Sequence, residues 1–284
     1  KNMFPGFRLG LMFEIRVVWC LVMSDILEDL RRKIRPYETN PGETDRTFDA
    51  AMDAITGGMA RSGVAAAIRE YKKSIRAFGK IPFDRSRPRG RVFVTGEFLL
   101  NFHPGSNFEV ESYLEKHNME VIMPRLTDIF WRDYIRAQSE VQDFHVSRPF
   151  REMLFAHIAD GLFSFVVTAL EKTALRHPLY KTSMRLPDLA AMADPVMHRT
   201  FTSGEGYLIP GEIIHHAKAG VRSFIILQPF GCIPNHISGR GVVKRLKKDF
   251  PQIQILPLDY DPDTSFANIE NRLQMLIMNA REAV

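Results

Sequence analysis

Hydrophobic positions recur at helical spacing over the first eighty residues of the chain. Over residues 17–34 apolar side chains return every three or four positions, and charged residues occupy the other faces. A proline-containing break follows, after which Thr44 is placed to cap a second helix. Residues 45–78 are rich in alanine and favour helix, with a weak point at the Gly57–Gly58 pair. We therefore expect residues 1–80 to form a helical region.

The pattern changes after a connector rich in proline and arginine at residues 79–91, which is the best domain boundary in the chain. Short apolar runs then alternate with amphipathic segments, which is typical of right-handed parallel crossovers. We expect strands near residues 91–95, 119–123, 223–228 and 253–257, with helices over 107–117, 240–250 and 265–280 and another helix that Gly220 ends. The pattern predicts a small doubly wound parallel sheet in a Rossmann-like α/β domain over residues 81–284, with a large helical insertion near 126–200.

Composition and charge narrow the class of protein. The chain is 45% hydrophobic and 25% charged, as in soluble globular proteins. Its 38 basic and 33 acidic residues give a formal charge of +5, spread along the chain without an aromatic-interleaved basic stripe, so we expect no nucleic-acid partner. The apolar run at residues 9–23 is interrupted by Glu14 and Arg16 and is shorter than the roughly 20 residues that a bilayer span needs. The apolar run at residues 161–170 is shorter still. We expect no membrane partner.

Polar residues follow three of the expected strands. Thr95 and Glu97 follow the first strand, "GCIPNH" follows the third, and "DYDP" follows the last. Ligands of open α/β sheets gather beyond the carboxyl ends of the strands, so these stretches are expected to converge on one rim. The alternative is that strand-to-helix loops contain glycine, proline, asparagine and aspartate for turn formation alone.

Cys232, in "GCIPNH", is the residue on which several interpretations depend. A nucleophile–base pair with His236 needs a helix, and Gly231 and Pro234 favour a loop instead. A structural zinc site needs four ligands, and an iron–sulfur cluster normally needs several thiolates. Composition alone therefore favours an inert cysteine. The other cysteine, Cys20, lies on the apolar face of the first helix, and two such distant cysteines form no disulfide framework, which is typical of the cytoplasm.

Two other motifs carry little information about function. "GEGYLIPG" and "GRGVVK" lack both the Walker spacing and the full dinucleotide fingerprint. His215 and His216 lie on an expected helix without a convincing acidic partner, so we interpret them as surface histidines.

Longer motifs carry a family resemblance. The stretch "GEGYLIPGEIIHHAKAGVRSFIILQPFGCIPNHISGRGVVKRLKKDFPQIQILPLDYDPDTSFANIENRLQMLI", together with "ILEDLRRKIRPYETNPGETD" and "VTGEFLLNFHPGSNFEVESYLEKHNMEVIMP", resembles the C-terminal part of the CoA-substrate-specific enzyme activases. These are also described as activators of (R)-2-hydroxyglutaryl-CoA dehydratase. In that family an ATPase module of actin-like fold precedes regions similar to 2-hydroxyacyl-CoA dehydratase subunits. The resemblance, and a first residue that is not methionine, imply the dehydratase-like portion of a much longer protein.

The resemblance also implies a function and a site. It makes Cys232 an iron–sulfur ligand in a module that takes part in ATP-driven low-potential electron transfer. Further residues expected to line the site are Gly204, Glu205, Gly206, Pro229, Gly231, Asn235, His236, Glu97, Asn101, Asp259 and Asp261. The alternative is a non-catalytic scaffold or docking module that keeps the fold without a cluster.

This chain departs from the family pattern, because the upstream cysteine motifs and the ATPase motifs are missing. The remaining ligands would belong to the upstream polypeptide or to another subunit, or the cluster has been lost. We therefore expect this fragment alone to carry no cluster and to be inactive. Its expected partners are the upstream ATPase and dehydratase-like regions, and a dehydratase or a second copy.

Overall fold

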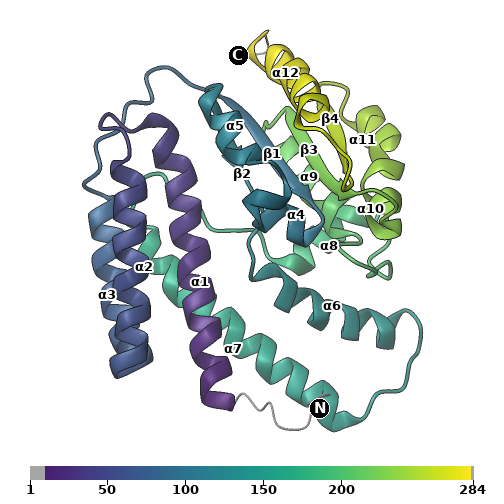
Figure 1. Cartoon of the computed structure of the whole chain (residues 1–284). Helices are drawn as coiled ribbons and strands as arrows, with labels where there is room; N and C mark the ends of the chain where they lie inside the picture. Colours follow the sequence, from purple (N-terminus) through teal and green to yellow (C-terminus); the bar gives the residue numbers. More distant parts are fainter. Residues whose placement is uncertain (1–9, 283–284) are drawn as a thin grey trace. The chain divides into compact units, whose positions relative to one another are not determined.

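The computed structural model describes residues 10–282 (Figure 1). The chain divides into two compact units. One comprises the residues up to Asp84 together with Phe155–Thr182, and the other comprises Arg85–Leu154 together with the residues from Ser183 onward. Phe155–Thr182, the middle of the expected helical insertion, belong to the same unit as the N-terminal helices.

The first unit is helical, as the periodicity of its sequence predicts. It contains α1 (Leu11–Ile34), α2 (Glu43–Ser62), α3 (Val64–Phe78) and most of α7 (Phe150–Ala174). Their apolar faces form one core, and the buried Tyr71 hydroxyl of α3 donates a 3.0 Å hydrogen bond to the Leu170 carbonyl of α7. The break between α2 and α3 falls at Gly63, whose φ of 74° is left-handed, and not at the Gly57–Gly58 pair.

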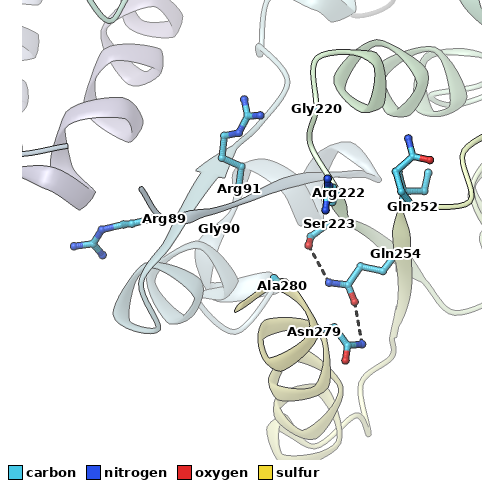
Figure 2. Close-up of a pocket in the computed structure, with 11 residues that line it drawn as sticks. Arg89, Gly90, Arg91, Gly220, Arg222, Ser223, Gln252, Gln254, Asn279 and Ala280 are labelled. Atoms are coloured by element: carbon cyan, nitrogen blue, oxygen red, sulfur yellow. Dashed lines mark hydrogen bonds between the residues drawn. The ribbon is translucent and has the colours of Figure 1, made fainter. Parts of the chain in front are cut away.

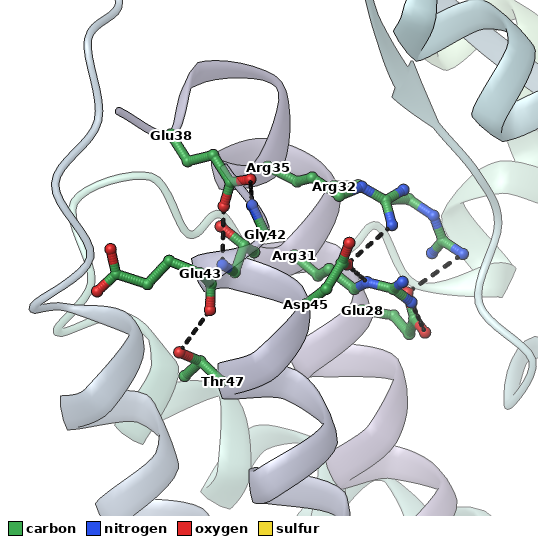
Figure 3. Close-up of polar contacts among 10 residues, drawn as sticks. Glu28, Arg31, Arg32, Arg35, Glu38, Gly42, Glu43, Asp45 and Thr47 are labelled. Carbon is green, nitrogen blue, oxygen red and sulfur yellow. Dashed lines mark hydrogen bonds and ion pairs between the residues drawn. The ribbon is translucent and has the colours of Figure 1, made fainter. Parts of the chain in front are cut away.

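The turn between α1 and α2 is held by charged side chains (Figure 3). Asp45 accepts hydrogen bonds from Arg31 at 2.6 Å and from Arg35 at 3.1 Å. The Glu38 carboxylate accepts from the backbone N–H groups of Gly42, at 2.5 Å, and Thr44, at 2.7 Å. The expectation that Thr44 caps α2 is therefore wrong, since Gly42 occupies the N-cap position and Glu38 supplies the acceptors.

The second unit is built on an all-parallel sheet, which confirms the predicted fold class. Within the described residues four strands lie in the order β2-β1-β3-β4: β1 (Gly90–Gly96), β2 (Met119–Ile122), β3 (Ser223–Pro229) and β4 (Gln254–Tyr260). Helices cover both faces (Figure 1). Val92 and Val94 belong to the core shared with α5 (Val110–Lys116) and α12 (Phe266–Glu282). Phe93 belongs to the core on the other face, with α9 (Leu208–Lys218) and α11 (Val243–Asp249).

Shorter elements complete this unit. They are α4 (Phe98–Phe102), α6 (Asp128–Gln142), α8 (Leu186–Ala193), α10 (Ile233–Ser238), and the 3-10 turns Pro104–Ser106 and Arg240–Val242; a third 3-10 turn, Arg35–Tyr37, lies in the first unit. The helix α10 corrects the expectation of a loop after β3. Pro234 lies in its first turn, where proline costs no backbone hydrogen bond.

Among the described residues, α7 is the one helix long and apolar enough to cross a bilayer by length and composition, and 17% of its most apolar window is buried. It is longer than residues 161–170, on which the sequence estimate rested, because the helix extends through the less apolar flanks of that run. A single helix of this kind is weak support for a membrane span, since core helices of soluble proteins meet the same criterion.

Candidate functional site

The carboxyl ends of β1 and β3 form the topological switch point of the sheet. From β1 the chain continues to β2 on one side, and from β3 it continues to β4 on the other. Ligands of doubly wound sheets bind in the crevice at such a point. Here the two strands approach closely at Gly96, where a Cβ atom would lie 2.0 Å from the Leu227 carbonyl oxygen. The next residue, Glu97, donates its N–H to the same carbonyl at 2.8 Å.

Glu205 and Asn235 join three loops at this crevice. The Glu205 carboxylate accepts a 3.1 Å hydrogen bond from the Phe98 N–H and a 2.7 Å hydrogen bond from the Asn235 side-chain amide. The same amide nitrogen lies 3.4 Å from the sulfur of Cys232. The structure thus brings together the segments after β1, before α9 and after β3, which are far apart in sequence.

Cys232 occupies the N-cap position of α10. The His236 N–H donates to the Cys232 carbonyl at 2.9 Å, and His236 Nδ1 lies 2.9 Å from that oxygen. The other ring nitrogen, Nε2, lies 3.6 Å from Asp259. A helix therefore places the two residues four positions apart, but the described contacts of the imidazole are to a carbonyl and a carboxylate, and the thiol contacts Asn235. A cysteine–histidine nucleophile pair is not formed in this arrangement.

The two aspartates at the end of β4, Asp259 within the strand and Asp261 just after it, have different surroundings. Asp259 accepts hydrogen bonds from Gln228 at 2.5 Å and pairs with Arg240 at 2.9 Å, so it belongs to the network around α10. Asp261 is exposed, and its carboxylate accepts the Asp263 N–H at 2.9 Å. That contact forms a local turn. Asp261 therefore does not join the polar contacts of the crevice.

Glu97 and Asn101 also differ in what they do. Glu97 caps α4, since its carboxylate accepts the Leu100 N–H at 2.9 Å. Asn101 is buried and lines a small cavity, and its amide oxygen has no hydrogen-bond partner among the described residues.

The expected glycines shape the backbone around the crevice. Gly204 and Gly206 have left-handed φ values of 55° and 51°, which glycine adopts without strain. A Cβ atom at Gly204 would lie 2.7 Å from Pro234 of α10, and one at Gly206 would lie 2.2 Å from the Phe201 carbonyl. Gly204 therefore lets the loop before α9 pack against α10, and Gly206 lets that loop fold back on its own backbone at Phe201. Pro229 ends β3, and Gly231, with a φ of 76°, turns the chain toward Cys232.

Glu212 is a residue of the candidate site that sequence reasoning missed. It is 6% exposed, and the Thr95 hydroxyl donates a 2.7 Å hydrogen bond to it. Burial raises the pKa of the Glu212 carboxyl to about 8, opposed by the Thr95 hydrogen bond and reinforced by the charges of Asp128 and Glu205. The signal available in the sequence was a carboxyl within the apolar run "YLIPGEII".

The Glu212 carboxyl lines a cavity of about 50 Å³ at the ends of β1 and α9. Its polar walls include Thr95, Asn101, Arg125, Asp128 and Glu205. A buried carboxylic acid that stays protonated near neutral pH can donate a proton or a hydrogen bond, and strongly shifted pKa values in clefts are typical of functional sites.

The described residues do not fit a complete metal centre. Between residues 10 and 282 no group of three or more histidine, cysteine, aspartate or glutamate side chains is placed to hold a metal ion. Cys20 lies in the other unit, is half-buried against its core, and has its thiol pKa raised by burial. A four-iron cluster needs several thiolates, and this crevice supplies Cys232 alone.

The second unit is therefore a doubly wound α/β domain, and polar side chains line the crevice at the switch point of its sheet. Comparison of the chain with family models, curated proteins and solved structures found no match.

Proposed function

We propose that the chain is the dehydratase-like module of a 2-hydroxyacyl-CoA dehydratase activator and takes part, within a longer cytoplasmic polypeptide, in ATP-driven low-potential electron transfer. The observation that carries the proposal is the contact of Asn235 with both Glu205 and Cys232. It joins "GEG" and "GCIPNH", both of which belong to the resemblance, at the carboxyl edge of the sheet, where open α/β domains commonly bind ligands.

In this proposal Cys232 supplies one ligand position of a cluster whose other ligands come from outside the chain. The Asn235 amide donates to its sulfur, and hydrogen bonds to a ligating sulfur tune a cluster. Phe230 and Ile233, on either side of the cysteine, are 73% and 71% exposed. They offer an apolar surface that a covering polypeptide would bury.

The test is anaerobic iron and sulfide analysis of the full-length protein. Cys232→Ser should lower the iron content, and the control Cys20→Ser should leave it unchanged, because Cys20 lies in the helical unit. This chain expressed alone should be colourless, because one thiolate fills one of the ligand positions of a cluster. An unchanged iron content in the Cys232→Ser protein would contradict the proposal.

A second candidate function is a docking module that keeps the fold without a cluster. The observation that favours it is the exposure of Phe230 and Ile233, since a partner that covers these apolar side chains would bind without a cluster. An iron-free full-length protein that still binds its dehydratase or ATPase partner would support this function and exclude the first.

A further inference from the structure

A cavity larger than the one beside Glu212 lies at the opposite edge of the sheet, at the amino ends of the strands. It has a volume of about 410 Å³, which is within the range of small-molecule sites. The starts of β1, β3 and β4 form its floor, and the loops before β3 and β4 and the last turns of α12 form its walls (Figure 2). Nothing in the proposed function uses this edge.

The lining of this cavity is basic and amide-rich. It contains Arg89, Arg91, Gly90, Gly220, Arg222, Ser223, Gln252, Ile253, Gln254, Asn279 and Ala280, and none of these is acidic. A hydrogen-bonded row crosses it, from Asn279 to Gln254 at 3.3 Å and from Gln254 to Ser223 at 2.9 Å (Figure 2). Arginine and amide side chains without a carboxylate favour an anionic ligand.

Arg91 and Arg222 are neighbours across the β1–β3 pair. They directly precede Val92 and Ser223, which are partners in the parallel register. Neighbouring strands lie about 4.8 Å apart, and like charges side by side on adjacent strands repel. Both arginines are exposed at the cavity, so an anion between them would relieve that repulsion.

The Arg91 guanidinium has N–H donors available for a ligand. Among the described contacts its guanidinium makes one hydrogen bond, a 3.2 Å bond to the Ala219 carbonyl at the end of α9, and a guanidinium carries five N–H donors. Gly220, with a φ of 83°, follows that carbonyl, and a Cβ atom there would lie 3.4 Å from the Arg91 guanidinium. The Arg89 side chain points away from Arg91 and Arg222 (Figure 2), and it donates to Asn118 at 2.9 Å, so the proposal does not include it.

We propose that this cavity binds the phosphate or diphosphate group of a small soluble molecule, held between Arg91 and Arg222, with the amides of the cavity recognising the rest of that molecule. Guanidinium groups bind phosphate oxygens in pairs. Arginine stays charged at every working pH, so the pH dependence of binding follows the ligand. A phosphate monoester should bind more tightly as pH rises through its second pKa of about 6.

The experiment is calorimetric titration of the whole chain with pyrophosphate. Arg91→Gln and Arg222→Gln should each weaken binding about tenfold, because each removes a charge-assisted contact. The matched control is Arg245→Gln on α11, an exposed arginine paired with Asp249 at 2.8 Å and outside the cavity, which should leave affinity unchanged. Added salt should weaken binding to the parent protein.

A second variant covers the case in which loss of Arg91 disturbs the end of α9. Gln252→Glu places a negative charge on an exposed lining position without touching either arginine, and it should also weaken binding while thermal unfolding stays unchanged. The proposal is overturned if the parent chain shows no saturable binding of pyrophosphate, or if the Arg245→Gln protein loses as much affinity as the Arg91→Gln and Arg222→Gln proteins. Equal affinity of the parent and Gln252→Glu proteins would overturn it as well.

Discussion

The side-chain amide of Asn235 donates a 2.7 Å hydrogen bond to the Glu205 carboxylate, and its residue is fully buried. Because the same nitrogen reaches the Cys232 sulfur, this one amide fixes the position of the cysteine relative to the loop before α9. The crevice is thus held by contacts among side chains that come from separate segments of the chain.

Replacement of Asn235 by leucine should lower the free energy of unfolding by about 2 kcal/mol, because it leaves a carboxylate oxygen without its donor. Loss of the N–H donor to sulfur should also slow alkylation of Cys232 by iodoacetamide, since the thiolate is the reactive form. Urea unfolding and a timed alkylation assay check the two effects. The control is Asn271→Leu on the exposed side of α12, which should change neither. Equal alkylation rates in the parent and Asn235→Leu proteins would show that the contact does not act on the sulfur.

Glu212 should make the stability of the second unit depend on pH. Its pKa in the folded protein, raised to about 8 by burial, exceeds the ordinary value of about 4.3 in the unfolded chain. The folded state therefore holds a proton that the unfolded state releases between these values, and stability falls as pH rises through this window, by at most about 1.4 kcal/mol per pH unit. Above about pH 8 the effect levels off.

Glu212→Gln should remove this dependence, because the neutral amide keeps the shape of the side chain and can still accept from Thr95. Urea midpoints measured from pH 5 to 8 should diverge between the two proteins, with the variant more stable at the upper end. The control is Asp188→Asn, which removes an exposed carboxyl. Its urea midpoints should change with pH in the same way as those of the parent protein. If the urea midpoints of the Glu212→Gln and parent proteins changed with pH in the same way, the Glu212 carboxyl would be ionised in the folded state.

The hydrophobic pattern alone was enough to predict the sheet. β1 and β3, in the middle of the sheet, carry runs of buried residues, whereas β4 at its edge is only partly buried. All three were placed within a few residues. The boundaries that failed are those that tertiary packing decides. Gly63 ends α2 because the chain must adopt a left-handed turn there, whereas Gly57 and Gly58 lie inside the helix.

The candidate site was only partly predictable. Strand ends carry polar residues in the sequence, so the loops that hold Glu205, Cys232 and Asp259 could be found. For Glu212 the sequence offers only a carboxyl within an apolar run. Its burial and its hydrogen bond with Thr95, a residue 117 positions away in sequence, become visible in the fold alone. The sequence also did not predict that the helical insertion is divided between two units, because helical periodicity does not say which core an apolar face will join.

Asp45 should contribute to stability in the helical unit in a pH-dependent way. Burial opposes ionisation of its carboxyl, but Arg31 and Arg35 outweigh it and hold the pKa below its ordinary value. Its contribution is therefore present above about pH 4 and is lost as pH falls through the lowered pKa. Because the side chain is 41% exposed, we expect Asp45→Asn to cost no more than about 1 kcal/mol at pH 7.

Thermal unfolding at pH 7 and at pH 3 checks this effect, with the exposed Asp49→Asn on the same helix as the control. The cost of Asp45→Asn should shrink at the lower pH, where the parent carboxyl is partly protonated. A cost that stays constant with pH would assign the contribution to packing and not to charge.

Gly96 should be the least replaceable glycine at the switch point. Its φ of 135° is outside the range that side chains favour, and an alanine Cβ would lie 2.0 Å from the Leu227 carbonyl oxygen, so β1 and β3 would have to separate. We expect Gly96→Ala to destabilise the second unit by more than about 3 kcal/mol, from backbone strain and steric overlap together.

Gly231→Ala isolates the strain alone, because its φ of 76° is also left-handed but no atom lies within 4 Å of the added carbon. That variant should cost about 1 kcal/mol. Urea unfolding of the two proteins tests the difference, and similar costs would show that the strands can move apart without penalty.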